Sequence, residues 1–182
     1  MSKYVLSILG CDRPGIVAQV SKILTEHKCN IEDLTQTVLQ TEFAAIFIIT
    51  AAHPHSLEEL VGALKSKLQP QGLNVLIKEM NAGCPLIQNP EPFVAVAIGP
   101  DQPGQIAGLS EVMRDFGCNI TAIKAINRSH LYPDKIVIII EMDVPLSATV
   151  PDLRQSLENI SSLLGLECSL QHKDIFESIH RV

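Results

Sequence analysis

Two copies of one sequence pattern make up most of the chain, and this duplication limits the possible folds more than any other feature. Residues 4–31 align with residues 93–120 at an offset of 89 (93 minus 4), sharing Gly-x-Asp-x-Pro-Gly and then Cys-Asn-Ile. Residues 57–73 align with residues 150–166 at an offset of 93 (150 minus 57), so the second copy has gained four residues, around Ser129–Pro133. Self-similarity at a fixed offset marks duplicated structural units. The 182-residue chain therefore predicts two small domains.

The boundary between the copies is a short proline-rich stretch. We predict a first domain over residues 1–82, a linker over 83–91 and a second domain over 92–182. Pro85 and Pro90 lie in this linker. Proline fixes φ and lacks an N–H, so these residues favour extended backbone and oppose a continuous helix.

Within each copy the hydrophobic periodicity changes in the same order. Short apolar runs bounded by turn residues predict strands, and apolar residues spaced by three and four predict helices. The predicted strands are 4–9, 30–40, 43–50 and 73–80 in the first copy, with 136–142 and 166–173 as the matching later strands of the second. One helix is predicted to begin at Pro14, and a second to be capped by Ser56. The order strand–helix–strand–strand–helix–strand predicts two ferredoxin-like βαββαβ domains of the α/β (α+β) class. Each would have a four-stranded antiparallel sheet with two helices on one face.

Charge and composition weigh against nucleic acid and membrane partners. The formal net charge is −6, there is no Trp, and no cluster of Lys and Arg is found. Phosphate neutralisation by basic residues supplies most nucleic-acid affinity, so direct nucleic-acid binding is not expected, although a direct DNA-binding repressor stays an alternative. No apolar run approaches the roughly 18 residues of a membrane span.

The N-terminus and the cysteines indicate the compartment. The chain enters a strand-like run at Tyr4, so no signal peptide is expected. The cysteines are an odd number without C-x-x-C spacing: Cys11, Cys29, Cys84, Cys118 and Cys168. Free thiols in a cytoplasmic protein are the expectation.

The turn between the first strand and first helix of each copy has the chemistry of an anion site. Pro14 suits the first helical position, because its missing N–H would have no partner there. Gly15 has no side chain, so a ligand can approach the free N–H groups of the helix N-terminus. Asp12 could cap the helix or accept an ammonium group, and Asp101 repeats it in the second copy. A capped helix with a tight entry turn is the structural alternative.

Valine is the substitution that this interpretation suggests. A valine at Gly15 or Gly104 is expected to block a ligand carboxylate while costing the helix start only modest propensity. Asn30 and Asn119 open the second strand of each copy, either as turn residues or as polar groups facing the same ligand. The neighbouring Cys29 is expected to be a small buried hydrophobe.

Other chemistry lacks a supporting motif, so no cofactor and no metal are expected. Gly10 and Gly15 have P-loop spacing, but Ile16 stands where a phosphate cradle needs Lys. His53 and His55 lie in a predicted loop without further ligands at a recognised spacing. No nucleophile–base motif is found, so no enzyme activity is expected, although an enzyme on this fold stays an alternative.

The Asp-x-Pro-Gly turn, the following apolar helix and the Asn-Ile pair, on a βαββαβ unit, resemble the ACT domain. The likeness covers nearly the whole chain as two copies. Four stretches resemble more narrowly the glycine cleavage system transcriptional repressor family: Asp12–Val17, Cys29–Asp33, Thr41–Phe43 and the Ala-rich part of the third strand.

The resemblance implies a regulatory protein. ACT domains usually pair side by side into an eight-stranded sheet and bind small amino acids at the pairing interface, and glycine is the amino acid that the narrower likeness implies. The implied partner is a separate DNA-binding regulator, and a homodimer is expected. The implied ligand-binding residues are Asp12, Pro14, Gly15, Ile16, Asn30 and Ile31, with Asp101, Pro103, Gly104, Gln105, Asn119 and Ile120.

Overall fold

The computed structural model describes residues 2–51, 56–80, 87–127 and 134–180, and these form two compact units, Met1–Cys84 (unit 1) and Pro85–Val182 (unit 2). The predicted linker lies in part outside the described residues, as do the four-residue insertion and the loop that contains His53 and His55.

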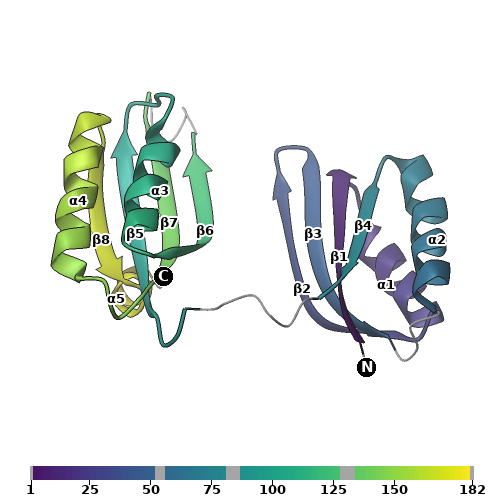
Figure 1. Ribbon diagram of the computed structural model, residues 1–182. Helices are drawn as coiled ribbons and strands as arrows, with labels where there is room; N and C mark the ends of the chain where they lie inside the picture. Colours follow the sequence, from purple (N-terminus) through teal and green to yellow (C-terminus); the bar gives the residue numbers. More distant parts are fainter. Residues whose placement is uncertain (1, 52–55, 81–86, 128–133, 181–182) are drawn as a thin grey trace. The chain divides into compact units, whose positions relative to one another are not determined.

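Unit 1 confirms the predicted βαββαβ order (Figure 1). Its antiparallel sheet has the strand order β2-β3-β1-β4, with α1 and α2 against it. Its elements are β1 (Ser2–Cys11), α1 (Ile16–Glu26), β2 (Cys29–Leu39), β3 (Glu42–Ala51), α2 (Ser56–Leu68), the 3₁₀ turn η1 (Gln69–Gln71) and β4 (Asn74–Glu79).

Unit 2 repeats this topology with the strand order β6-β7-β5-β8. Its elements are β5 (Glu91–Gly99), α3 (Gln105–Asp115), β6 (Asn119–Ile126), β7 (Ile136–Val144), α4 (Val150–Leu163), β8 (Glu167–His172) and α5 (Lys173–His180). The predicted ferredoxin-like fold is therefore confirmed in both copies. The predicted pairing of the two sheets stays a prediction.

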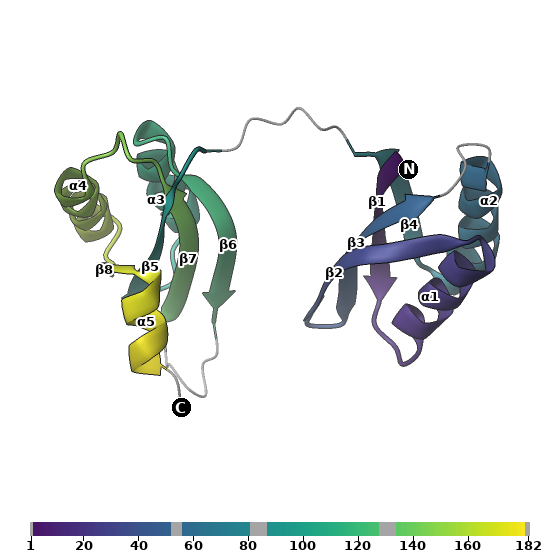
Figure 2. The ribbon, with the colours of Figure 1, turned by 90° about the horizontal axis from the view of Figure 1, so that it is seen from below.

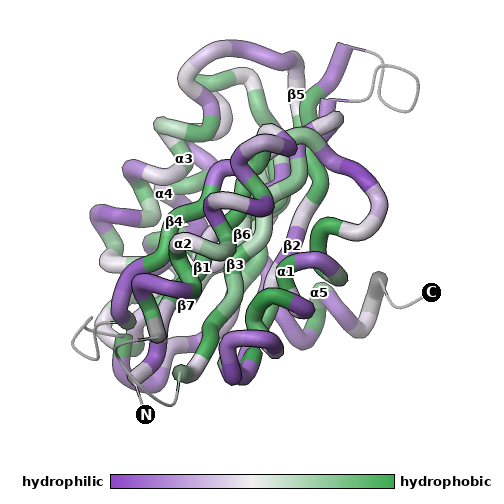
Figure 3. Tube along the Cα trace, turned by 90° about the vertical axis from the view of Figure 1, so that its right-hand side faces the viewer, coloured by the Kyte–Doolittle hydropathy of each residue, from purple (hydrophilic) through white to green (hydrophobic). Residues whose placement is uncertain are grey.

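The core of each unit lies between the sheet and its two main helices. Side chains alternate between the faces of a strand, so Tyr4, Leu6 and Ile8 of β1 all point toward the helices and are buried. They pack with the apolar stripes of α1 and α2, which include Val20 and Leu64. Hydrophobic residues accordingly concentrate along the strands and on one side of the helices (Figure 3).

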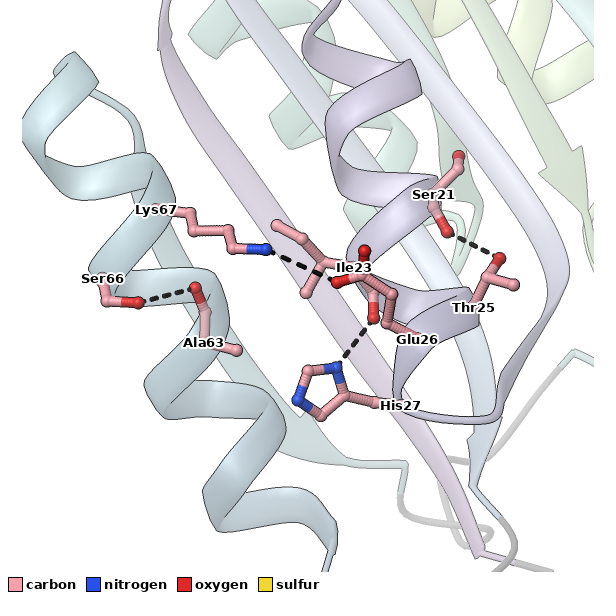
Figure 4. A network of polar contacts seen from close by, with 8 residues as sticks. All are labelled: Ser21, Ile23, Thr25, Glu26, His27, Ala63, Ser66 and Lys67. Carbon is pink, nitrogen blue, oxygen red and sulfur yellow. Dashed lines mark hydrogen bonds and ion pairs between the residues drawn. The ribbon is translucent and has the colours of Figure 1, made fainter.

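Polar contacts connect the helices of unit 1 near their ends (Figure 4). Lys67 Nζ of α2 lies 3.4 Å from Glu26 Oε2 of α1, and both side chains are exposed, so the pair contributes little to stability. His27 Nδ1 lies 2.9 Å from the carbonyl oxygen of Ile23 at the end of α1. The apolar core, rather than these surface contacts, holds the helices to the sheet.

Two repeated glycines explain a close approach that both units share. A Cβ on Gly10 would lie 2.5 Å from the carbonyl oxygen of Gly72, and a Cβ on Gly99 would collide with that of Gly165. Gly72 and Gly165 have φ of +79° and +70°, a left-handed conformation in which glycine is favoured. The end of the first strand therefore packs directly on the backbone that enters the last strand.

Unit 2 has one element that the sequence analysis missed, the C-terminal helix α5 (Figure 2). It packs against β5 and β8, and Lys173 Nζ at its start lies 2.8 Å from Glu141 Oε2. Glu141 pairs in register with Val94 on the sheet face away from α3 and α4. Val94 is only 1% exposed, whereas its counterpart Val5 is half-buried. Helical spacing of Ile175 and Phe176 with Ile179 is a signal that could have found this helix.

None of the helices in the described part of the chain combines the length and the apolar character that crossing a membrane requires.

Candidate functional site

The turn after β1 is held from two sides. The backbone N–H of Asp12 donates to the carbonyl oxygen of Thr41, between β2 and β3, at 2.8 Å. The guanidinium of Arg13 donates to the backbone oxygen of Gln71 at 2.9 Å and to its Oε1 at 2.7 Å. The turn is thus fixed between the β2–β3 connection and η1. Asp12, Pro14 and Gly15 are exposed on it.

Gly15 and Gly104 are the N-cap residues of α1 and α3, with φ of +93° and +90°. The prediction that Pro14 is the first helical residue is therefore wrong, because α1 begins at Ile16 and the proline lies before the cap. No side chain caps either helix, so the capping role considered for Asp12 is not observed. The first N–H groups of both helices stay available to an anion.

A valine at either glycine would not be the mild change that the sequence suggested. A Cβ at Gly15 or Gly104 would meet nothing within 4 Å, so space is no obstacle. A β-branched residue at such a φ is a genuine outlier, however, and would strain the helix start. The loss of stability would confound the loss of binding, so asparagine, which tolerates the left-handed region, is the better substitution.

The equivalent turn of unit 2 is held from inside. Gln105 is 2% exposed, and its Nε2 donates to the carbonyl oxygens of Pro100 at 2.8 Å and Leu164 at 3.2 Å. Its Oε1 accepts from the backbone N–H of Gln102 at 3.3 Å. This side chain is occupied by its own chain and holds the turn to the end of α4, so it does not face a ligand as expected.

The counterpart of Gln105 in unit 1 is also buried. Ile16 is 3% exposed, and its side chain packs in the core of unit 1 beneath the turn. Only the backbone of these two positions is placed to meet a ligand, because their N–H groups lie at the helix N-termini. Asp101 differs from Asp12 too, since its Oδ2 accepts from Asn127 Nδ2 at 2.7 Å.

The structure does not bring Asn30 to the turn of its own unit. Asn30 pairs with Thr50, whereas Cys11, which precedes the turn, pairs with Glu42. Thr50 and Glu42 lie eight positions apart on β3, about 26 Å at the usual rise of a strand. The expectation that Asn30 faces the same ligand as the turn of its own copy is therefore wrong, because β1 and β2 run in the same direction.

Unit 2 shows the same separation. Asn119 pairs with Asp143 and Gly99 pairs with Ile136, at opposite ends of β7. Ile31 and Ile120 follow the two asparagines and are half-buried, beside a β-bulge that recurs in both units. This bulge carries no local sequence signal beyond the repeat itself, so it was not predicted.

Three of the cysteines and the potential metal ligands of the described segments do not add a site. Burial raises the pKa of the thiols of Cys29, Cys118 and Cys168, which favours the unreactive protonated form. In the described segments, no cluster of three or more His, Cys, Asp or Glu side chains could hold a metal ion. Among the residues singled out from the sequence, those of the exposed helix-start turns are therefore the candidates for binding a ligand.

Comparisons with known proteins agree with this architecture. The model of the ACT domain family matches residues 3–78. A UPF0237 protein of Methanopyrus kandleri is 42% identical over 72 residues, which cover 40% of this chain and 77% of the relative. A UPF0237 protein of Methanococcus maripaludis is 32% identical over 82 residues, covering 44% and 91%.

Two solved structures match both units. An unknown protein from Galdieria sulphuraria has a TM-score of 0.78 at 20% identity, covering 94% of this chain and 98% of that one. A candidate glycine cleavage system transcriptional repressor has a TM-score of 0.71 at 20% identity, covering 93% and 96%. At this identity the two likenesses concern the fold.

Proposed function

Because the chain belongs to the ACT-domain family, as a tandem of two such domains, we propose that it is a regulatory protein that binds a small amino acid. In this proposal it has no catalytic role, works in the cytoplasm and acts through contact with a separate DNA-binding regulator. The observation that carries the proposal is the repeated helix start, in which Gly15 and Gly104 share one left-handed conformation and no side chain caps the helix.

The helix start has the chemistry for an amino-acid zwitterion. The uncapped N–H groups and the positive end of the helix dipole favour a carboxylate. The carboxylate of Asp12, exposed on the same turn, can accept an ammonium group. Gly15 leaves open space above the backbone, since a Cβ there would touch nothing within 4 Å. The exposed Pro14 and its counterpart Pro103 would form the apolar wall of the site.

Edge pairing would complete the site. β2 and β6 are edge strands, and an exposed edge can accept a second strand. If such an edge pairs antiparallel with the corresponding edge of another ACT domain, the start of each strand lies beside the end of the other and therefore beside the partner domain's turn. Asn30 and Ile31 of β2, or Asn119 and Ile120 of β6, would then face the turn of that partner domain. This pairing reconciles the predicted residue set with the 26 Å separation within each unit.

The two sites would differ in affinity. The carboxylate of Asp12 has no side-chain partner among the described residues, whereas that of Asp101 already accepts from Asn127. A ligand ammonium group must compete with this bond at the second turn. We therefore expect the turn of unit 1 to bind more tightly.

Calorimetric titration with amino acids tests the proposal, with glycine first because a candidate glycine cleavage repressor shares the fold. We expect Asp12→Asn to raise the Kd about tenfold, the loss of about 1.4 kcal/mol for one ammonium–carboxylate contact. Gly15→Asn should raise the Kd at least as much while preserving the backbone conformation. Asp101→Asn should have a smaller effect.

The matched control is Asp152→Asn, an exposed aspartate in the first turn of α4 that should leave the Kd unchanged. Thermal melting of each variant reports whether the fold survives. The amino-acid site is disproved if the folded Asp12 and Gly15 variants bind as the wild type does, or if no amino acid binds at millimolar concentration.

The proposed action through a separate DNA-binding regulator is tested by measuring whether the chain alone binds DNA. With a net charge of −6 the chain alone should not bind duplex DNA specifically at physiological salt. Mobility shifts measure this, and nanomolar, sequence-selective binding would favour a direct DNA-binding repressor instead. Reproducible turnover in a screen of metabolites, lost on changing Asp12, would favour an enzyme.

A further inference from the structure

Unit 1 has an apolar groove between α2 and β4. The groove has a volume of about 470 Å³ and is lined by Leu57, Glu58, Val61, Gly62, Lys65, Val75, Leu76 and Ile77, which we call the α2–β4 strip. β4 is an edge strand, so its outer backbone groups have no neighbouring strand within the sheet of unit 1. Leu76 is 65% exposed.

Unit 2 closes the corresponding place with its own side chain. The counterpart of Val61, at an offset of 93, is Arg154, which donates from Nη1 to the carbonyl oxygen of Leu170 at 2.6 Å. Leu170 is the counterpart of Ile77 at the same offset. A long side chain thus covers the edge of β8, whereas Val61 is too short to cover the edge of β4. The two copies have diverged at the residue that decides whether this edge is open.

Charges at the two ends of the strip are complementary to a second copy of the strip. Glu58 and Lys65 lie seven residues apart on one face of α2, about 10.5 Å along the axis. Neither has an ion partner in the described part of the chain. A two-fold axis passing near Val61 and Gly62 would place Glu58 of each chain beside Lys65 of the other.

We propose that the α2–β4 strip binds the same strip of a second copy of this chain about such a two-fold axis. β4 would pair antiparallel with its copy, and the apolar side chains would pack between the two α2 helices. Gly62, where a Cβ would meet nothing within 4 Å, allows the helices to approach closely. The contact is isologous, because one patch meets itself.

Unit 2 does not offer this contact. The positions equivalent to Glu58 and Lys65 are Pro151 and Glu158, which would not form the complementary pairs. A strip about 20 Å long belongs to the small interfaces, so we expect a dimer of micromolar affinity. The amino-acid site would use the edges β2 and β6, so the two proposals concern different edges.

Sedimentation velocity of the full chain tests the interface. Val61→Arg copies the closing residue of unit 2 and should raise the dimer Kd at least tenfold. Lys65→Glu should do the same, because the new carboxylate would then face Glu58 of the other chain. The double variant Glu58→Lys with Lys65→Glu exchanges the charges and should restore a Kd close to that of the wild type.

The control is Glu158→Lys, a reversal at the equivalent position of unit 2, which should leave the Kd unchanged. Circular dichroism confirms that each variant is folded. A wild-type chain that is monomeric at about 100 μM overturns the proposal, as does a Val61→Arg chain that dimerises normally or a double variant that is not restored. Amino-acid binding by Val61→Arg should match the wild type, so the outcome for this interface is separable from that for the ligand site.

Discussion

Unit 1 fixes the turn after its first strand with a side chain at the surface, whereas unit 2 fixes the same turn with a buried amide. Arg13 reaches across to Gln71 from outside, and Gln105 bonds to Leu164 from within the fold. Gln71 and Leu164 occupy equivalent positions at the offset of 93. In both units a side chain therefore connects the turn to the end of the second helix, a contact that we call the tether. The residue that makes the tether lies at a different position in each unit.

This difference teaches that duplicated domains can keep a backbone geometry while exchanging the side chains that hold it. Both turns end at a left-handed glycine, at φ of +93° and +90°, despite their different tethers. The two units share the backbone geometry of the turn and differ in the side chains that hold it. Substitutions can break each of these contacts separately.

The largest effect is expected at the shared glycines. In Gly99→Ala the new Cβ would collide with the carbonyl oxygen of Gly165 and approach Leu166, so we expect unit 2 to lose about 3 kcal/mol. Gly10→Ala should destabilise unit 1 similarly. Urea unfolding measures the loss, and hydrogen exchange assigns it to a unit. Gly62→Ala, in open space within α2, should instead stabilise the monomer by about 0.5–1 kcal/mol, measured at a concentration at which the α2–β4 strips are not paired. Unchanged stability of both strand variants would show that the backbones can separate freely.

A smaller and unequal effect is expected at the tethers. Gln105→Leu removes the donor to two carbonyl groups and the acceptor for one N–H, so unit 2 should lose about 2 kcal/mol. Arg13→Leu breaks exposed bonds that water can replace, so unit 1 should lose less than about 1 kcal/mol. The same unfolding and exchange measurements apply. Equal losses in the two units would contradict the contrast between a buried and a surface tether.

Within unit 2, the smallest of these effects is expected from α5. Ending the chain after His172 removes the helix that packs on β5 and β8, and with it the ion pair of Lys173. Val94 should then become exposed, and unit 2 should lose about 1 kcal/mol by the loss of buried apolar area. Thermal melting measures the change. Ile175→Ala is the control, because Ile175 is 54% exposed and its truncation should matter little. A shortened chain that melts as the full chain does would mean that α5 adds no stability.

Much of the fold could be predicted because its signals are local. Strand and helix periodicity, the repeated turn and the duplication place the eight strands that the described residues form and the four helices of the two repeats. The short helix α5 was missed, since it has no counterpart in the first copy to draw attention to it. The start of α1 was misplaced, because Pro14 and Gly15 are both acceptable near a helix start and only φ distinguishes them.

The candidate site was less predictable than the fold. The turn residues were found together because they are adjacent in sequence, but Asn30 was assigned to the same place although the sheet register puts it at the other end. Gln105 was assigned to the ligand because its residue type suits binding, whereas its partners Pro100 and Leu164 occupy it. Residue type alone does not reveal whether a polar group is already satisfied.

The sequence by itself determined that this protein consists of two βαββαβ units, each with an Asp-x-Pro-Gly turn before its first helix, since these features follow from short-range patterns. Only the tertiary structure decided that Gly10 must lack a side chain, that Asn30 lies far from its own turn, and that Arg154 closes one edge while Val61 leaves the other open. Each of these depends on strand register or on contacts between residues distant in the chain. Such contacts exist only once the sheet has formed and the helices have packed on it.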